Sequence, residues 1–113
     1  MLPAQHRLTQ ARDFKKIRNY GQPFFSSLFS LRRLANQRPL SRFSVVVSTK
    51  VTKKATGRNR LKRQLREIIR LHLAKIKPGY DIIIITKPVT LAKNYQELKQ
   101  AAIALLAKAR LLK

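Results

Sequence analysis

The sequence predicts a single α+β domain spanning residues 1–113, in which helices pack against a central mixed sheet. Three stretches carry this prediction. Residues 53–70 have the apolar spacing of an amphipathic helix, residues 42–50 alternate like a strand, and residues 80–86 contain four consecutive isoleucines. The predicted order is therefore helix, strands, helix, strand, helix, and a chain of 113 residues can bury one modest core.

The first predicted helix runs from Gln10 to about Tyr20. Thr9 is a suitable N-cap, and Gly21 is a suitable stop. Asp13 falls in the first turn, where the helix dipole favours a carboxylate.

Two strands are expected after this helix. The first is a single strand over residues 24–34, with one face formed by Phe25, Phe29 and Leu31 and the other by Ser26, Ser30 and Arg32. The second covers residues 42–50, with a core face of Phe43, Val45 and Val47 and an accessible face of Arg42, Ser44, Val46, Ser48 and Lys50.

The second half of the chain gives the clearest local signals. The helix that begins near residue 53 should reach about Lys75, and Pro78-Gly79 turns the chain into the strand of residues 80–86. A continuous apolar strand of this kind is covered on both faces. The last helix starts near Asn94, and Glu97 three residues later predicts a capping box. Its apolar stripe is Leu98, Ala101, Ala102, Leu105, Leu106 and Ala109.

The charge balance indicates the class of partner. Lys and Arg total 26 against four acids, which gives a net charge of +22. A compact domain repels itself at this charge, so a polyanionic partner is expected. Nucleic acid fits better than a membrane, because the cations are spread over several predicted elements rather than along one amphipathic helix. No apolar run is long enough to span a membrane and no signal peptide is visible, so we expect a cytoplasmic protein without a membrane partner.

The sequence offers little that could perform catalysis. The four acids lie in four different predicted segments, there is no cysteine, and the three glycines form no phosphate-binding loop. We therefore expect no catalytic residue, no metal ligands, no bound cofactor and no small-molecule substrate.

The basic helix carries the strongest functional signal. At roughly 100° per residue, five of its cations and one asparagine share a sector of about 140°, opposite Leu61, Leu65, Ile68 and Ile69. The residues in this sector are Arg58, Asn59, Lys62, Arg63, Arg66 and Arg70. The cations crowd the first two turns, where the helix dipole favours carboxylates instead. Because this placement opposes local stability, it indicates a polyanion-binding face rather than an ordinary solvated one.

The same residues resemble a known family. Ser48-Thr49-Lys50-Val51, Lys54-Ala55 and Arg58-Asn59-Arg60-Leu61-Lys62-Arg63-Gln64-Leu65-Arg66-Glu67 are similar to the strand end and the helix motif of the protein component of bacterial ribonuclease P. Weaker matches at Arg7-Leu8, Asp13-Phe14, Gly79-Tyr80-Asp81 and Lys87-Pro88 extend the resemblance over nearly the whole chain.

The resemblance implies a fold like the second domain of ribosomal protein S5, with a left-handed βαβ crossover. It also implies that the basic helix binds ribonuclease P RNA, which hydrolyses precursor tRNA with Mg²⁺ that the RNA requires. The matching RNA-binding positions are Arg58, Asn59, Arg60, Lys62, Arg63 and Arg66; Lys50, Lys53 and Lys54 flank them, and Arg70 completes the face.

A second implied site is a cleft that holds the 5′ leader of precursor tRNA as a single strand. Phe14 matches the family's first aromatic, whereas Arg18 and Arg32 stand where further aromatics are common. Arg42, Ser44 and Ser48 would form the polar floor. Core packing is the alternative role for Phe14. For the whole chain, the alternatives are a ribosomal or general RNA-binding protein and a nuclease acting without RNA.

Overall fold

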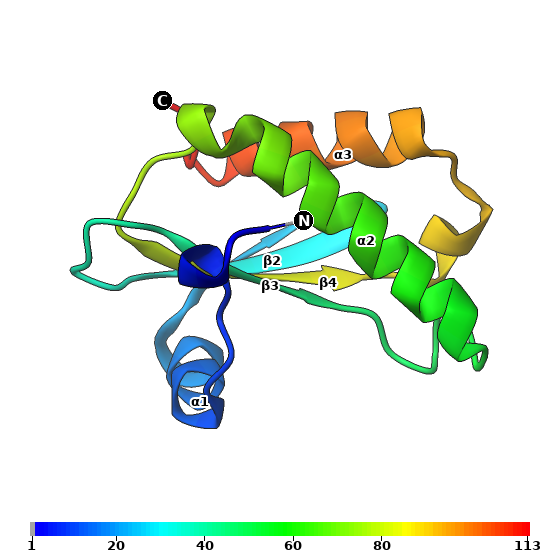
Figure 1. The fold of residues 1–113 in the computed structure, drawn as a ribbon, viewed down its shortest axis with the longest axis horizontal. Coiled ribbons are helices and arrows are strands. Elements are labelled where there is room, and N and C mark those ends of the chain that lie inside the picture. The colour runs from blue at the N-terminus through cyan, green and yellow to red at the C-terminus, as the bar shows by residue number, and fades with distance from the viewer. Residues whose placement is uncertain (1) are drawn as a thin grey trace.

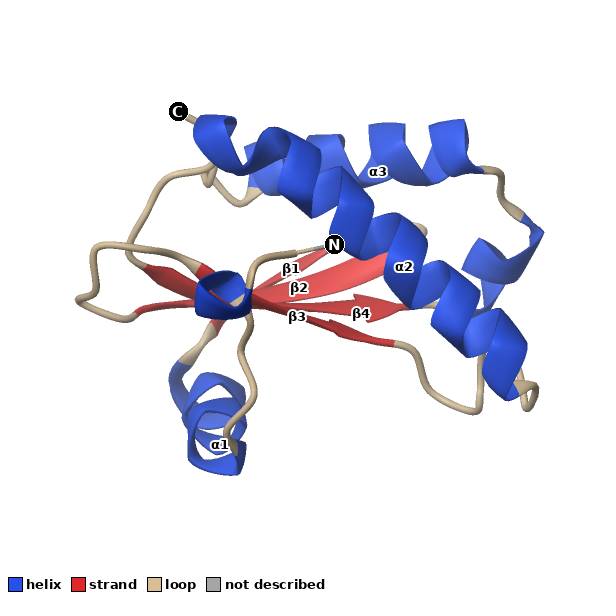
Figure 2. Cartoon of the chain, viewed as in Figure 1, coloured by secondary structure: helices blue, strands red, loops and turns tan. Residues whose placement is uncertain are grey.

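The structure is a computed structural model that describes residues 2–113, so residue 1 of the predicted domain lies outside the described residues. The main elements are α1 (Ala11–Tyr20), β1 (Gln22–Phe25), β2 (Phe29–Ala35), β3 (Arg42–Val46), α2 (Ala55–His72), β4 (Tyr80–Thr86) and α3 (Tyr95–Lys108). Short 3-10 helices are η1 (Ala4–His6), η2 (Leu73–Lys75) and η3 (Pro88–Ala92). The strands form one sheet in the order β1-β2-β4-β3 (Figure 2). Because β4 is antiparallel to β2 and parallel to β3, the predicted mixed sheet is confirmed.

The main core lies between the sheet and two helices. Figure 1 shows α2 and α3 on one face of the sheet and α1 on the other. The predicted stripe of α2 is buried, and in α3 Leu98, Ala102, Leu105 and Leu106 are buried. These helices cover Phe29, Leu31, Phe43, Val45, Ile82 and Ile84 of the sheet. Amphipathic periodicity therefore placed both helices correctly.

A smaller second core lies under α1. Ile17 of α1, Leu8 and Ile83 of β4 are buried together, with Phe14, Leu34 and Val46 packed around them. The two cores confirm that β4 is covered on both faces over most of its length. Its end is the exception, since Ile85 is 37% exposed.

The prediction of one strand over residues 24–34 was wrong. The chain forms a hairpin in which β1 and β2 pair antiparallel around a turn at residues 26–28. The Ser26 amide donates to the Phe29 carbonyl at 2.8 Å, and the Ser26 hydroxyl also bonds Phe29. Phe25 pairs with Ser30 and so lies on the sheet face opposite Leu31, not beside it. The three-residue turn therefore places Phe25 on the other sheet face from Phe29 and Leu31, where its side chain is exposed.

Several predicted boundaries also change. Gln10 is the N-cap of α1 and makes no side-chain cap bond, so the predicted Thr9 cap was wrong. β3 ends at Val46 rather than at residue 50, although Val47 is still buried. The capping box of α3 is confirmed, because Asn94 Oδ1 accepts from the Glu97 amide at 2.9 Å and the Glu97 carboxylate accepts from the Asn94 amide at 3.2 Å.

The N-terminal segment, residues 2–8, joins the two cores. Leu2 is buried in the main core and Leu8 in the second core. Between them the segment runs along the outer side of β3, where Arg7 forms a parallel bridge with Phe43 and the Leu8 amide donates to the Phe43 carbonyl at 2.8 Å. The segment thereby covers this edge of the sheet. Among the described residues, no helix combines the length and apolar character that crossing a membrane requires.

Candidate nucleic-acid interface

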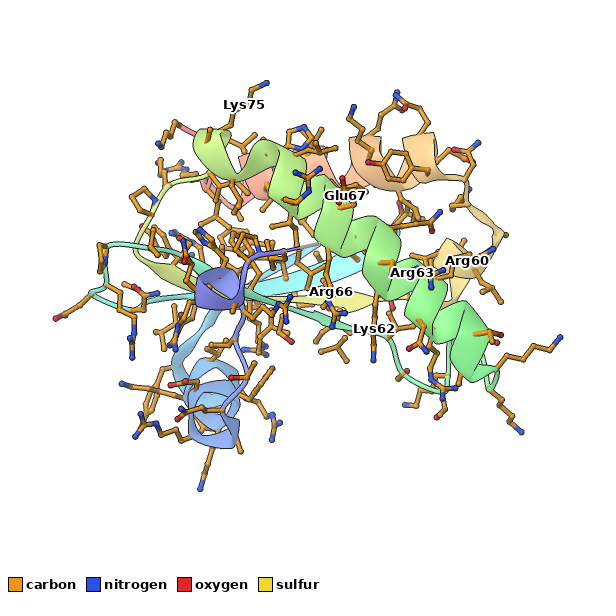
Figure 3. All side chains as sticks on the ribbon, in the orientation of Figure 1. Arg60, Lys62, Arg63, Arg66, Glu67 and Lys75 are labelled. Carbon is orange, nitrogen blue, oxygen red and sulfur yellow. The ribbon has the colours of Figure 1, made fainter. Side chains whose placement is uncertain are left out.

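The predicted cations of α2 lie along both edges of its exposed side. Figure 3 shows Lys62 and Arg66 along the lower edge of α2, whereas Arg60 lies on the opposite edge. Arg60, Arg63 and Arg66 are exposed and Lys62 is half-buried. Lys50, Lys53 and Lys54 are exposed in the loop that leads from β3 into α2, and Asn59 is exposed in the first turns of α2. Leu61 and Leu65 anchor the buried side of the same turns, so the cations are held on a rigid element.

Two of the predicted RNA-binding arginines have internal partners. The Arg58 guanidinium donates to the Thr52 carbonyl at 3.0 Å and so ties the preceding loop to α2. Arg70 donates to Glu67 at 3.0 Å and 2.5 Å. The hydrogen bond from Arg70 lowers the pKa of Glu67 to about 2, so this carboxylate stays charged and partly neutralises the end of the basic face. Within residues 2–113, the other cations of the set form no ion pair.

The arginines predicted to line the leader cleft hold α1 in place. Arg42 donates to Asp81 at 2.8 Å and 2.7 Å, and it lies 3.4 Å from the Asp13 carboxylate of α1. The hydrogen bond to Asp81 is the main reason why the pKa of Arg42 is raised. At the other end of α1, Arg32 donates to the carbonyls of Arg18 and Gly21 at 3.4 Å and 3.3 Å. A helix C-terminus favours a nearby cation, because the negative end of the helix dipole lies there. Both guanidinium groups are therefore engaged within the protein.

The remaining cleft positions are less closely grouped. Phe14 is half-buried against the second core, so core packing accounts for at least part of its side chain. Ser44 is half-buried and pairs with Ile83 on the face that α1 covers. Arg18 is exposed on α1, and Ser48 is exposed beyond the end of β3. Of these positions, Phe14 and Arg18 therefore belong to α1, Ser44 lies on the sheet face that α1 covers, and Ser48 lies outside the sheet.

An exposed row on the sheet was missed by sequence reasoning. Strand pairing places Phe25, Ser30, Ile85 and Val46 side by side across all four strands, on the same face as α1. Phe25 is 57% exposed and Ile85 is 37% exposed. We call these four residues the open row. The one local signal is the Ser26-Ser27 pair between two apolar runs, since serine is common in turns, but this pair does not by itself select a hairpin.

The hairpin that carries Phe25 is fixed by lysines. Lys108 Nζ of α3 donates to the Phe25 carbonyl at 2.8 Å, and Lys87 Nζ donates to the Ser26 carbonyl. These hydrogen bonds come from two other parts of the chain, so the position of the exposed ring is determined by tertiary structure.

The carboxylates are all engaged. Asp13 and Asp81 share Arg42, Glu67 pairs with Arg70, and Glu97 caps α3 and lies 3.7 Å from Lys93. Among the described residues, no group of three or more His, Cys, Asp or Glu could hold a metal ion. The exposed cations of α2 can bind anions, and the exposed Phe25 ring can contact apolar ring faces. These features define the class of protein: a small, basic α+β protein that binds nucleic acid.

Comparison with known proteins identifies the family. The family model described as Ribonuclease P matches residues 2–110. A ribonuclease P protein component from Pseudanabaena sp. is 41% identical over 113 residues, covering 99% of this chain and 97% of the relative. One from Synechocystis sp. is 43% identical over 96 residues, covering 84% and 77%. The chain therefore belongs to the family of bacterial ribonuclease P protein components, the protein subunit of the ribonucleoprotein endoribonuclease that processes tRNA.

Solved structures agree with this assignment. The ribonuclease P protein from Thermotoga maritima is 31% identical and superimposes with a TM-score of 0.83, covering 90% of this chain and 96% of that one. A Staphylococcus aureus structure with 24% identity and a TM-score of 0.89 shows the same fold. Superposition preserves handedness, so the β3–α2–β4 crossover has the same hand as in these structures. Membership in the family implies an RNA partner.

Proposed function

We propose that this chain binds ribonuclease P RNA through α2 and the loop before it, and that it binds the 5′ leader of precursor tRNA on the sheet face beside α1. The observation that carries the first part is the set of exposed cations opposite the buried stripe of α2. Neutralising RNA phosphates with these side chains releases counterions and favours binding. Asn59 adds a donor and an acceptor for a base edge or a ribose hydroxyl.

The hydrolysis itself belongs to the RNA in this proposal. The Mg²⁺ ions would be bound by RNA phosphates, because the four carboxylates of the protein are held by cations and by a helix cap. The protein contributes positive charge between two polyanions and a surface that positions the leader. The expected site of action is the cytoplasm.

The open row supports the second part of the proposal. An exposed aromatic ring can stack on any base, which suits a leader of variable sequence. Phe25 offers such a ring, and Ile85 and Val46 extend the apolar surface towards α1. Arg18 is exposed on the neighbouring helix and can contact phosphates. Arg32 and Arg42 act on the leader only indirectly, by fixing the position of α1.

One cleavage experiment tests the proposal against its alternatives. Precursor tRNA is incubated with the protein alone, with ribonuclease P RNA alone, and with both at low Mg²⁺. We expect cleavage at the mature 5′ end only when both are present. Cleavage by protein freed of all RNA would support a nuclease acting without RNA. Failure of the protein to lower the Mg²⁺ requirement of the RNA would favour a ribosomal or general RNA-binding protein.

A further inference from the structure

An open cavity lies beside the start of α2, on the side away from Lys62 and Arg66. Its volume is about 500 Å³, and its lining comes from three parts of the chain. The loop before α2 and the first turns of α2 supply Thr52, Lys54, Thr56, Arg60 and Arg63, and η3 supplies Leu91. The lining combines three cations, two hydroxyl groups and one exposed aliphatic side chain.

Leu91 is held firmly at this position. In η3, Thr90 is fully buried, and its amide and hydroxyl both donate to the Lys87 carbonyl, at 3.0 Å and 2.7 Å. The start of α2 packs closely beside it, since a Cβ atom added at Gly57 would lie 3.9 Å from the Leu91 side chain and 3.0 Å from that of Thr52. Leu91 is nevertheless 38% exposed. A rigid aliphatic surface beside three cations is thus available to a partner.

The lining has the chemistry of a nucleotide site. Within residues 2–113, Lys54, Arg60 and Arg63 form no ion pair, and no carboxylate lines the cavity. Phosphate binding alone would need only the cations, because a phosphodiester gains nothing from a leucine. A nucleobase has an apolar face that contacts aliphatic side chains and edges that bond hydroxyl groups. A base inside a duplex is stacked and cannot present its face, so an unpaired nucleotide is required.

We propose that this cavity binds one unpaired nucleotide of the RNA subunit. The base lies against Leu91, the flanking phosphates contact Arg60 and Arg63, and the Thr56 hydroxyl bonds the ribose or a base edge. This assignment rests on the proposed function, because it requires that the protein bind that RNA. It adds a position that distinguishes one RNA conformation from another, whereas the cations alone bind any phosphate backbone.

The test separates an apolar contact from an electrostatic one. Leu91→Ala should weaken binding to ribonuclease P RNA about fivefold, because less apolar surface is buried, without changing the slope of log affinity against log salt. Arg63→Ala should reduce that slope by about 0.7, the value for one single-strand phosphate. Leu91→Met should restore most of the affinity. Val89→Ala is the matched control, since Val89 lies in the same η3 turn, is 45% exposed and does not line the cavity.

Each result has a defined meaning. Equal affinities for Leu91→Ala, Val89→Ala and the parent protein would overturn the nucleotide site while leaving the proposed function intact. For the expected result, the melting temperature of Leu91→Ala must be close to that of the parent protein. If Leu91→Ala melts at a lower temperature, a reduced affinity that Leu91→Met does not restore counts against the site. Absence of RNA binding by the parent protein would overturn both proposals. Protection of one unpaired nucleotide from chemical probing, abolished in Leu91→Ala and kept in Val89→Ala, would identify the occupant.

Discussion

Replacing Arg42 with methionine should release α1 from the sheet. In the folded protein the guanidinium makes two hydrogen bonds to Asp81, at 2.8 Å and 2.7 Å, and approaches Asp13 to 3.4 Å. The Arg42 and Asp81 side chains are only 15% and 7% exposed. Removing one partner of such a buried pair typically costs about 3–5 kcal/mol, because the other charge is left without compensation. Asn36 still donates to Asp81 at 2.9 Å, so we expect a value near the lower end, about 3 kcal/mol.

For a domain of 113 residues, about 3 kcal/mol corresponds to a decrease in melting temperature of about 12 °C. The assay is thermal and denaturant unfolding of Arg42→Met, Asp81→Asn and the double variant. The double variant should be more stable than the sum of the single effects predicts, because it removes both charges of the Arg42–Asp81 pair together. Asp13, which lies 3.4 Å from Arg42, loses its partner in both variants that lack Arg42. Affinity for ribonuclease P RNA, measured well below the melting temperature, should not change, since α2 lies on the opposite face of the sheet. A destabilisation below about 1 kcal/mol, or additive effects in the double variant, would refute this reasoning.

Four further predictions concern the RNA-binding surfaces. Replacing both Lys62 and Arg66 with alanine should weaken binding of ribonuclease P RNA and lower the salt slope by about 0.9 for each duplex phosphate that is no longer neutralised; an unchanged slope would show that this side of α2 does not contact RNA. Phe25→Ala should weaken holoenzyme binding of precursor tRNA about tenfold and leave mature tRNA nearly unaffected, because one stacked base is worth about 1–3 kcal/mol. Phe14→Ala should weaken leader binding too, but with a lower melting temperature because the ring also packs in the second core; equal decreases in affinity for both tRNAs would exclude a role in leader binding. Glu67→Gln should strengthen RNA binding, since it frees its arginine partner. The pKa of Glu67 is lowered from 4.5 to about 2. The Glu67–Arg70 ion pair therefore contributes its full stability above pH 4.5, and this contribution disappears as the pH falls towards 2. NMR titration of the Glu67 carboxyl group can follow the change.

Local sequence patterns correctly predicted the elements whose apolar spacing or capping residues follow one helix or strand pattern throughout. The buried stripes of α2 and α3, the capping box at Asn94 and the bounds of β4 follow from spacing within a few residues. The hairpin did not, because the alternation in residues 24–34 is compatible with one strand, and only the bonds at Ser26 select the turn. A shift of this kind transfers a side chain such as Phe25 to the other face.

Only those parts of the candidate site that lie within one element could be predicted from the sequence. The cations of α2 lie within one helix, so their common face can be worked out from the sequence. The pairing of Arg42 with Asp81 joins residues 39 apart in the chain. The cavity beside Leu91 also joins η3 to the start of α2, which no sequence spacing indicates. Such arrangements are fixed by tertiary packing and are visible only in the folded chain.

The N-terminal segment and β1 together affect how the free protein behaves in concentrated solution. An uncovered sheet edge can recruit a strand from another molecule and lead to aggregation. Here Arg7 and Leu8 occupy the outer side of β3, and the opposite edge strand, β1, is four residues long and contains Pro23, which has no amide hydrogen to donate. Neither edge offers a regular ladder to a second copy. Strand exchange between copies is therefore disfavoured at both edges, and mutual repulsion at a net charge of +22 acts in the same direction.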